Sequence, residues 1–141
     1  MVSDPKPRLN TTMGLTQVYK GAGTGRPFFK KYGKVFYDQT NLGIALCNVQ
    51  NSKVWAGSVT TKALLTIVGA KAFMGASTST CLYNYEKGII YKGAGTDVPL
   101  YKWVGTTLYE GASTAKIVMN WTGNPFSLAD VFAAITLLKT R

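Results

Sequence analysis

The apolar and polar positions of the chain repeat with a period of eighteen residues between residues 17 and 124. Glycine stands two residues after an aromatic residue in five of the six periods, with Gln39 as the exception, and a small residue follows it. Six copies without an insertion predict an array of one small unit, because fixed-period self-similarity is the signature of a repeat architecture. The six aromatic residues are Tyr19, Tyr37, Trp55, Phe73, Tyr91 and Tyr109.

Each period contains two segments with the pattern of a short strand. Residues 53–56 form the first segment of one period, and residues 63–68 form the second, where Ala63, Leu65 and Ile67 alternate with the residues between them. This period-two pattern of β-branched and apolar residues is typical of strands. Turns rich in Gly, Ala, Ser and Thr separate the segments. We expect the polar residues of the second segments to face water: Thr66, Asn84, Lys102 and Asn120.

Two architectures fit twelve short strands in six equal units. In a two-sheet β-solenoid each unit is one coil, and equivalent residues stack in parallel ladders about 4.8 Å apart. In the alternative, each unit is an antiparallel hairpin, and the array closes into a barrel or a propeller-like ring. A solenoid needs a constant coil length, whereas hairpin arrays tolerate uneven loops. The invariant spacing therefore favours the solenoid.

The repeats end before a predicted helix over residues 127–139. Ser127 is placed as its N-cap, with Asp130 at the position of a variant capping box. We expect the helix to cover an open end of the solenoid with one apolar face: Leu128, Val131, Phe132, Ile135 and Leu138. The expected organisation is an N-terminal arm over 1–16, a six-repeat β domain over 17–124 and a C-terminal capping helix over 125–141.

The repeat units resemble those of a loosely defined group of uncharacterised bacterial short-repeat β proteins. The likeness lies in Tyr-x-Gly-[Ala/Ser] units of about eighteen residues, such as LYEGASTAKIVMNWTG, and in the amphipathic ending FSLADVFAAITLL. The second unit departs from this pattern at Gln39. The resemblance covers residues 17 to 139 and bears on architecture, because the group has no assigned activity.

The composition offers little chemistry for catalysis. The chain has no histidine, and its six carboxylates lie far apart in sequence; Asp38 and Glu110 share a repeat position, but four repeats separate them. We therefore expect no enzyme activity, no metal and no cofactor. The two cysteines, Cys47 and Cys81, are too few for a disulfide scaffold, and we expect both thiols to be free and buried.

A net charge of +10, from 16 basic and 6 acidic residues, favours acidic partners. The densest basic cluster is a candidate polyanion site, although a solvated N-terminal edge is the favoured explanation. The aromatic column from Tyr19 to Tyr109 is a candidate stacking platform for sugars or bases, although packing between neighbouring coils is the favoured role. The candidate basic residues are Arg26, Lys30, Lys31 and Lys34.

The predicted function is that of a non-enzymatic structural protein, a self-associating protomer of a filament, shell or virion. The alternative is a binding module for an anionic polymer or a carbohydrate, using the basic cluster and the aromatic column. The expected partners are further copies of the chain, then an anionic polymer or glycan. No segment has the pattern of a signal peptide or the length of a membrane span, which predicts cytoplasmic synthesis, with a place inside an assembled particle or an exported filament, and no membrane insertion.

Overall fold

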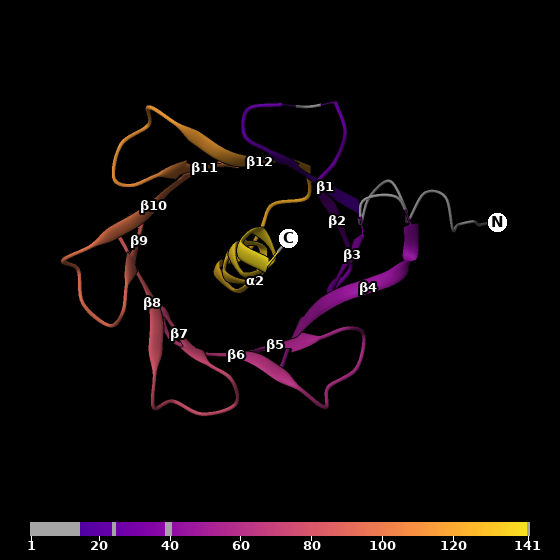
Figure 1. The fold of residues 1–141 in the computed structure, drawn as a ribbon, viewed down its shortest axis with the longest axis horizontal. Coiled ribbons are helices and arrows are strands. Elements are labelled where there is room, and N and C mark those ends of the chain that lie inside the picture. The colour runs from indigo at the N-terminus through magenta and orange to yellow at the C-terminus, as the bar shows by residue number, and fades with distance from the viewer. Residues whose placement is uncertain (1–14, 24, 39–40, 141) are drawn as a thin grey trace.

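The computed structural model describes residues 15–23, 25–38 and 41–140. It shows a closed barrel of twelve antiparallel strands with one helix in its centre (Figure 1). The helix is α2 (Leu128–Thr140). The strands are β1 (Leu15–Lys20), β2 (Phe29–Tyr32), β3 (Val35–Asp38), β4 (Asn41–Gln50), β5 (Lys53–Ala56), β6 (Ala63–Val68), β7 (Lys71–Met74), β8 (Cys81–Glu86), β9 (Ile89–Lys92), β10 (Pro99–Val104), β11 (Thr107–Glu110) and β12 (Ile117–Gly123).

The hairpin connectivity shows that the solenoid favoured from the sequence is wrong and that the alternative, a closed antiparallel barrel, is right. Each strand pairs with its sequence neighbours, and β12 closes the ring by pairing with β1, with Lys20 opposite Met119. Asn51 and Ser52 join β4 to β5 with φ angles of 57° and 59°, as a type I′ hairpin turn requires. Two-residue turns join antiparallel strands, whereas parallel strands need a crossover of about a dozen residues or more.

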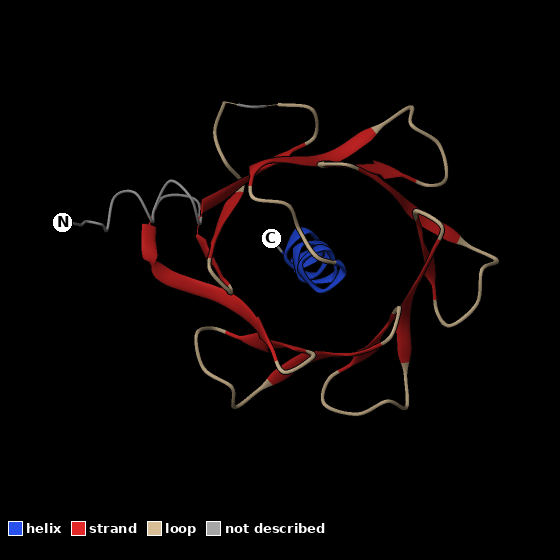
Figure 2. Cartoon of the chain, turned by 180° about the vertical axis from the view of Figure 1, so that it is seen from behind, coloured by secondary structure: helices blue, strands red, loops and turns tan. Residues whose placement is uncertain are grey.

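The two ends of the barrel differ in their connections. Two-residue turns, such as 51–52 and 87–88, lie at one end, which we call the turn end. Longer loops, such as 57–62 and 93–98, lie at the other end, which we call the loop end. These loops project outward from the barrel wall (Figure 2). The predicted arm falls largely on residues 1–14, outside the described residues, and β1 begins at Leu15.

Two of the four polar residues expected to face water, Thr66 and Asn84, are buried beneath the projecting loops, whereas Lys102 and Asn120 are partly exposed. Asn48 holds the same repeat position, and on the outer face of the wall Asn48, Thr66 and Asn84 are 0%, 7% and 5% exposed. Asn48 Nδ2 donates hydrogen bonds to the carbonyls of Gly57 and Val59, both at 2.9 Å. Thr66 bonds to the carbonyl of Gly75 in the same way at 2.8 Å. These side chains therefore donate hydrogen bonds to loop carbonyls and tie the loops to the wall.

The lumen of the barrel is lined by two rings of side chains that follow the eighteen-residue period. Six residues of one ring are fully buried: Val18, Phe36, Val54, Ala72, Ile90 and Leu108. The second ring also belongs to the core: Phe29, Cys47, Leu65, Tyr83, Tyr101 and Met119. A barrel of twelve strands is too wide to be filled by its own side chains, since about eight strands give that width. An additional element has to occupy the centre.

Helix α2 fills the lumen instead of covering an end, which corrects the capping role expected for residues 125–141. Its 13 residues are about 20 Å long, close to the length of a six-residue strand. The sequence placed a single apolar face toward the core, but Ala133, Ala134 and Leu137 are buried as well. A helix with apolar residues on every side is typically buried on every side. In the described part of the chain, no helix is long and apolar enough to cross a membrane.

The start of α2 agrees with the sequence prediction. The Ser127 amide donates to Asp130 Oδ2 at 3.0 Å, and the Asp130 amide donates to Ser127 Oγ at 3.2 Å. This reciprocal pair is a capping box with aspartate in the usual place of glutamate. Phe126 precedes it and stacks on Trp121 of β12 with ring centroids 4.6 Å apart. The stacking and the cap together direct the chain from the wall into the lumen.

Candidate functional site

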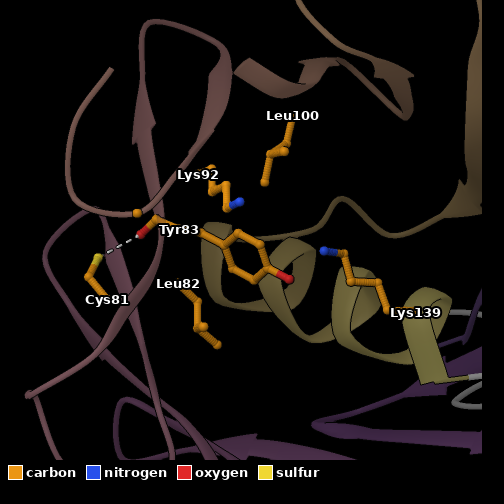
Figure 3. Close-up of a pocket in the computed structure, with 7 residues that line it drawn as sticks. Cys81, Leu82, Tyr83, Lys92, Leu100 and Lys139 are labelled. Atoms are coloured by element: carbon orange, nitrogen blue, oxygen red, sulfur yellow. Dashed lines mark hydrogen bonds between the residues drawn. The ribbon is translucent and has the colours of Figure 1, made fainter. Parts of the chain in front are cut away.

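A pocket of about 330 Å³ opens at the loop end, between the last turn of α2 and the barrel wall. Its volume lies at the lower end of the range for small-molecule sites, which is about 300–1,000 Å³. Strands β8, β9 and β10 supply the wall, and α2 supplies the inner side (Figure 3). The lining residues are Cys81, Leu82, Tyr83, Lys92, Gly93, Leu100 and Lys139.

A bulge in β8 accompanies three consecutive residues that line this pocket, Cys81, Leu82 and Tyr83. Ala72 pairs with Tyr83 and Phe73 pairs with Cys81, so Leu82 is an extra residue opposite β7. In a regular strand, neighbouring side chains point to opposite faces. The extra residue breaks this alternation and re-aims a side chain, which is a common role of bulges near binding sites. Leu82 and Tyr83 therefore both line the pocket.

Tyr83 presents its hydroxyl to the pocket. The side chain is 6% exposed, and its ring stacks on Phe132 of α2 with centroids 5.9 Å apart. Burial raises the pKa of Tyr83, so the phenol stays protonated at neutral pH and can donate a hydrogen bond. Among the described residues, none forms a hydrogen bond with this hydroxyl, which points toward Lys139 in Figure 3.

Two ammonium groups face the same space. The Lys139 Nζ lies 5.5 Å from the centroid of the Tyr83 ring, which makes a cation–π contact. Lys92 ends β9 and points its amine toward the pocket in Figure 3. It has no ion-pair or hydrogen-bond partner within the described ranges. The lining contains no carboxylate, so the pocket combines positive charge with the apolar surfaces of Leu82 and Leu100.

A second pocket of about 300 Å³ lies two repeats away in the same end of the barrel. Here a carboxylate is present, and Glu110 Oε1 lies 3.3 Å from Lys116 Nζ. Lys20 Nζ lies 5.5 Å from the centroid of the Phe28 ring. The lining residues are Lys20, Gly21, Glu110, Lys116, Ile117, Val118 and Leu138.

The basic cluster singled out in the sequence is distributed over several parts of the barrel. Arg26 is exposed in the first loop, and Lys34 occupies a turn at the opposite end, where it donates to Gln50 Oε1 at 3.2 Å. Lys31 faces the lumen, where its Nζ lies 3.8 Å from Asp130 and 5.9 Å from the Phe36 ring centroid. Lys30 precedes it and points to the outer face. The four residues do not converge on one surface.

The six aromatic residues form a belt around the outside of the barrel. Each follows a fully buried lumen residue, as Trp55 follows Val54, and therefore points outward. Tyr19 is 8% exposed and the other five are partly exposed. The ring contacts within the described chain do not join any two of the six, because equivalent residues are two strands apart rather than one. The coil-to-coil packing favoured for them is therefore wrong, and a binding role stays a prediction.

Sequence reasoning did not identify Tyr83, Lys92 or Lys139 as site residues. Lys92 carried a readable signal, because its repeat position varies in charge while the glycine position after it is nearly constant. Lys139 carried none, because only the placement of α2 inside the barrel brings it to the wall. Among the described residues, no group of three Cys, Asp or Glu side chains gathers as a metal site would need.

Comparison of the chain with protein-family models, curated proteins and solved structures finds no match in any of the three. The resemblance to bacterial short-repeat proteins therefore stays a prediction. A fold alone does not determine function, so the side chains of the site support the proposal below.

Proposed function

We propose that this protein is a non-enzymatic binding module that holds a small ligand with an anionic group and an apolar body. The observation that supports this most is the convergence of Lys92, Lys139 and the Tyr83 hydroxyl on one pocket, none with a hydrogen-bond partner within the described residues. An anionic group would accept hydrogen bonds from all three. Leu82 and Leu100 would contact the apolar body.

The lining does not favour a catalytic role. It contains no carboxylate and no histidine that could accept a proton. The Cys81 Sγ donates to the backbone carbonyl of Tyr83 at 3.4 Å, so its close polar contact in the pocket is with the main chain. Binding without turnover is the function that this set of groups supports.

Self-association remains a second proposal, and the closed barrel changes its basis. An open solenoid would expose strand edges, but a closed ring has none. Apolar side chains on the surface are the remaining basis. Those about half exposed are Ile44, Val59, Val68, Met74, Val98 and Val104, at 51%, 55%, 54%, 54%, 48% and 48%. Sedimentation at high concentration and moderate salt tests this proposal, and a compact monomer would contradict it.

Binding of an anionic polymer has weaker support. The basic cluster that suggested it spans the loop end, the outer wall, the lumen and the turn end. Retention on heparin that falls steeply with salt would support it, because each neutralised charge releases a counterion. Salt-independent retention would count against it.

Calorimetric titration with octanoate tests the proposed pocket, with octanol as the uncharged control. We expect octanoate to bind more tightly than octanol, and Lys92→Gln or Lys139→Gln to weaken octanoate about 10-fold or more, since hydrogen bonds to charged groups contribute about 1.5–3 kcal/mol. Lys53→Gln on the outer wall is the matched control and should leave binding unchanged. Equal binding of octanol and octanoate, or no binding of either, would contradict the proposal.

A further inference from the structure

The last residue of each odd-numbered strand occupies a special position in the repeat. It lies at the loop end, directly before the small-residue turn. Residues at this position line both pockets described above: Lys92 lines the first, and Lys20 and Glu110 line the second. The neighbouring repeat positions are nearly uniform, with glycine following in five of six copies. This position differs in charge from copy to copy: Lys20, Asp38, Ala56, Met74, Lys92 and Glu110.

The two pockets are copies of one site related by two repeats. Leu82 of the first pocket and Val118 of the second are 36 residues apart, which is two repeats. Two repeats beyond Lys92, the ring has passed from the last repeat into the first, and the equivalent residue is Lys20. In both pockets the last turn of α2 supplies the inner side, through Lys139 in one and Leu138 in the other. The barrel thus carries two cavities of about 330 and 300 Å³ at equivalent places in the repeat, with different charged groups around them.

The two pockets differ in the charged residues that line them. The first pocket has Lys92 and Lys139 and no carboxylate. The second has Lys20 and Lys116, but Glu110 lines it and pairs with Lys116 at 3.3 Å. Both partners of this pair are well exposed, at 60% and 74%, so the pair is weak and the carboxylate stays beside the pocket opening. A carboxylate at that place repels an anionic ligand, and specificity often depends on such a repulsive group.

We infer that the last residue of the odd-numbered strands is the specificity-determining position of the loop end, and that Glu110 excludes from the second pocket the anion that the first accepts. This inference rests on the proposed function, because the first pocket sets the ligand chemistry. It predicts that the second pocket is a latent anion site. Removing the carboxylate leaves Lys20 and Lys116 without an acidic neighbour in the lining, which reproduces the pair of cations in the first pocket.

The test is the stoichiometry of octanoate binding to the intact chain, measured by calorimetry. We expect one site in the natural protein and two in Glu110→Gln, with dissociation constants within about tenfold of each other. Adding Lys20→Gln to that variant should return the count to one. Glu86→Gln is the matched control, because Glu86 ends β8 near the turn end and lines neither pocket.

The outcomes are distinguishable. One site in both the natural protein and a folded Glu110→Gln overturns the inference and leaves the proposed function in place. Two sites in the natural protein also overturn it, because Glu110 then excludes nothing. No binding by the natural protein contradicts the proposed function and the inference with it. Unchanged circular dichroism and melting temperature establish that each variant is folded.

Discussion

The side chain of Asn120 donates a hydrogen bond to the carbonyl of Gly21 at 2.8 Å, across 99 residues of sequence. It also reaches the carbonyl of Gly23 at 3.1 Å. Asn48 makes the same two hydrogen bonds with the carbonyls of Gly57 and Val59, which lie in the next repeat along the chain. The junction of the first and last repeats therefore has the same geometry as the junctions between consecutive repeats. The ring closes in register with its own period.

Removing these amides should destabilise the barrel. We expect Asn48→Ala and Asn120→Ala each to lower the free energy of unfolding by about 1–3 kcal/mol, because each removes two hydrogen bonds to loop carbonyls. Urea denaturation measures the change. Lys102→Ala is the matched control, since Lys102 holds the same repeat position with no hydrogen-bond partner in the described ranges. A cost for Lys102→Ala equal to that of the asparagine variants would contradict this account.

Removing the large side chain of Phe132 at the centre of α2 should destabilise the protein. Phe132 is fully buried and stacks on Tyr83 of the wall. Phe132→Ala should lower the free energy of unfolding by about 3–5 kcal/mol, as for other buried aromatic residues. Thr140→Ala, at the exposed end of the same helix, is the control and should change little. An unchanged melting temperature for Phe132→Ala would mean that α2 does not contribute to the core.

Two substitutions of Trp121 should differ in their effect on stability. The side chain is 1% exposed, and its Nε1 has no hydrogen-bond partner among the described residues. Trp121→Phe removes an unsatisfied donor while it keeps the stacking on Phe126, so stability should change by about 1 kcal/mol or less. Trp121→Ala should cost about 3–5 kcal/mol. Chemical denaturation of both variants checks the difference, and a large loss for Trp121→Phe would indicate a partner for Nε1.

The sequence predicted the strands and the helix well because both depend on local patterns. The predicted segments 53–56 and 63–68 coincide with β5 and β6, and the predicted helix 127–139 begins and ends one residue before α2. The choice between solenoid and barrel failed because the eighteen-residue period fits both. The two-residue turns, such as Asn51-Ser52, carried a signal for hairpins, because the positive φ angles at both positions are those of the type I′ turns that join antiparallel strands.

The candidate site was harder to predict than the fold. Lys92 and Lys139 lie 47 positions apart in sequence, and the lumenal placement of α2 is what brings them to one pocket. The apolar residues on every side of residues 128–138 could have indicated a surrounded helix. The basic cluster at 26–34 drew attention because its members are close in sequence. In a barrel, consecutive residues point alternately to the lumen and to solvent, so closeness in sequence divides a cluster between two faces.

The two thiols should react at different rates in the folded protein. Both cysteines are free, as expected, but Cys47 is buried whereas Cys81 is partly exposed at the pocket, which corrects the burial expected for Cys81. Alkylation with iodoacetamide followed by mass spectrometry should modify Cys81 first, and Cys47 after unfolding. Octanoate should slow the reaction of Cys81 if it occupies the pocket. Equal rates for both thiols would contradict the burial of Cys47.

Cys47 should also give the stability of the protein an alkaline dependence. Burial, and secondarily the negative charge of Asp130, raise the pKa of this thiol from 9.0 to about 12. Above pH 9 the thiol of the unfolded chain loses its proton while the folded protein keeps it, so the unfolded state binds fewer protons and the free energy of unfolding falls as the pH rises. The contribution is complete below pH 9 and is lost progressively up to about pH 12.

The difference between natural protein and Cys47→Val isolates this contribution from other alkaline titrations, including those of Tyr83 and Tyr101, whose pKa values are also raised by burial. Urea unfolding between pH 8 and pH 10.5 should show a steeper loss of stability in the natural protein than in Cys47→Val, because valine has no proton to lose. Parallel curves for the natural protein and Cys47→Val would show that the Cys47 thiol titrates equally in both states, and hence that it is not held in the dry interior between the wall and α2.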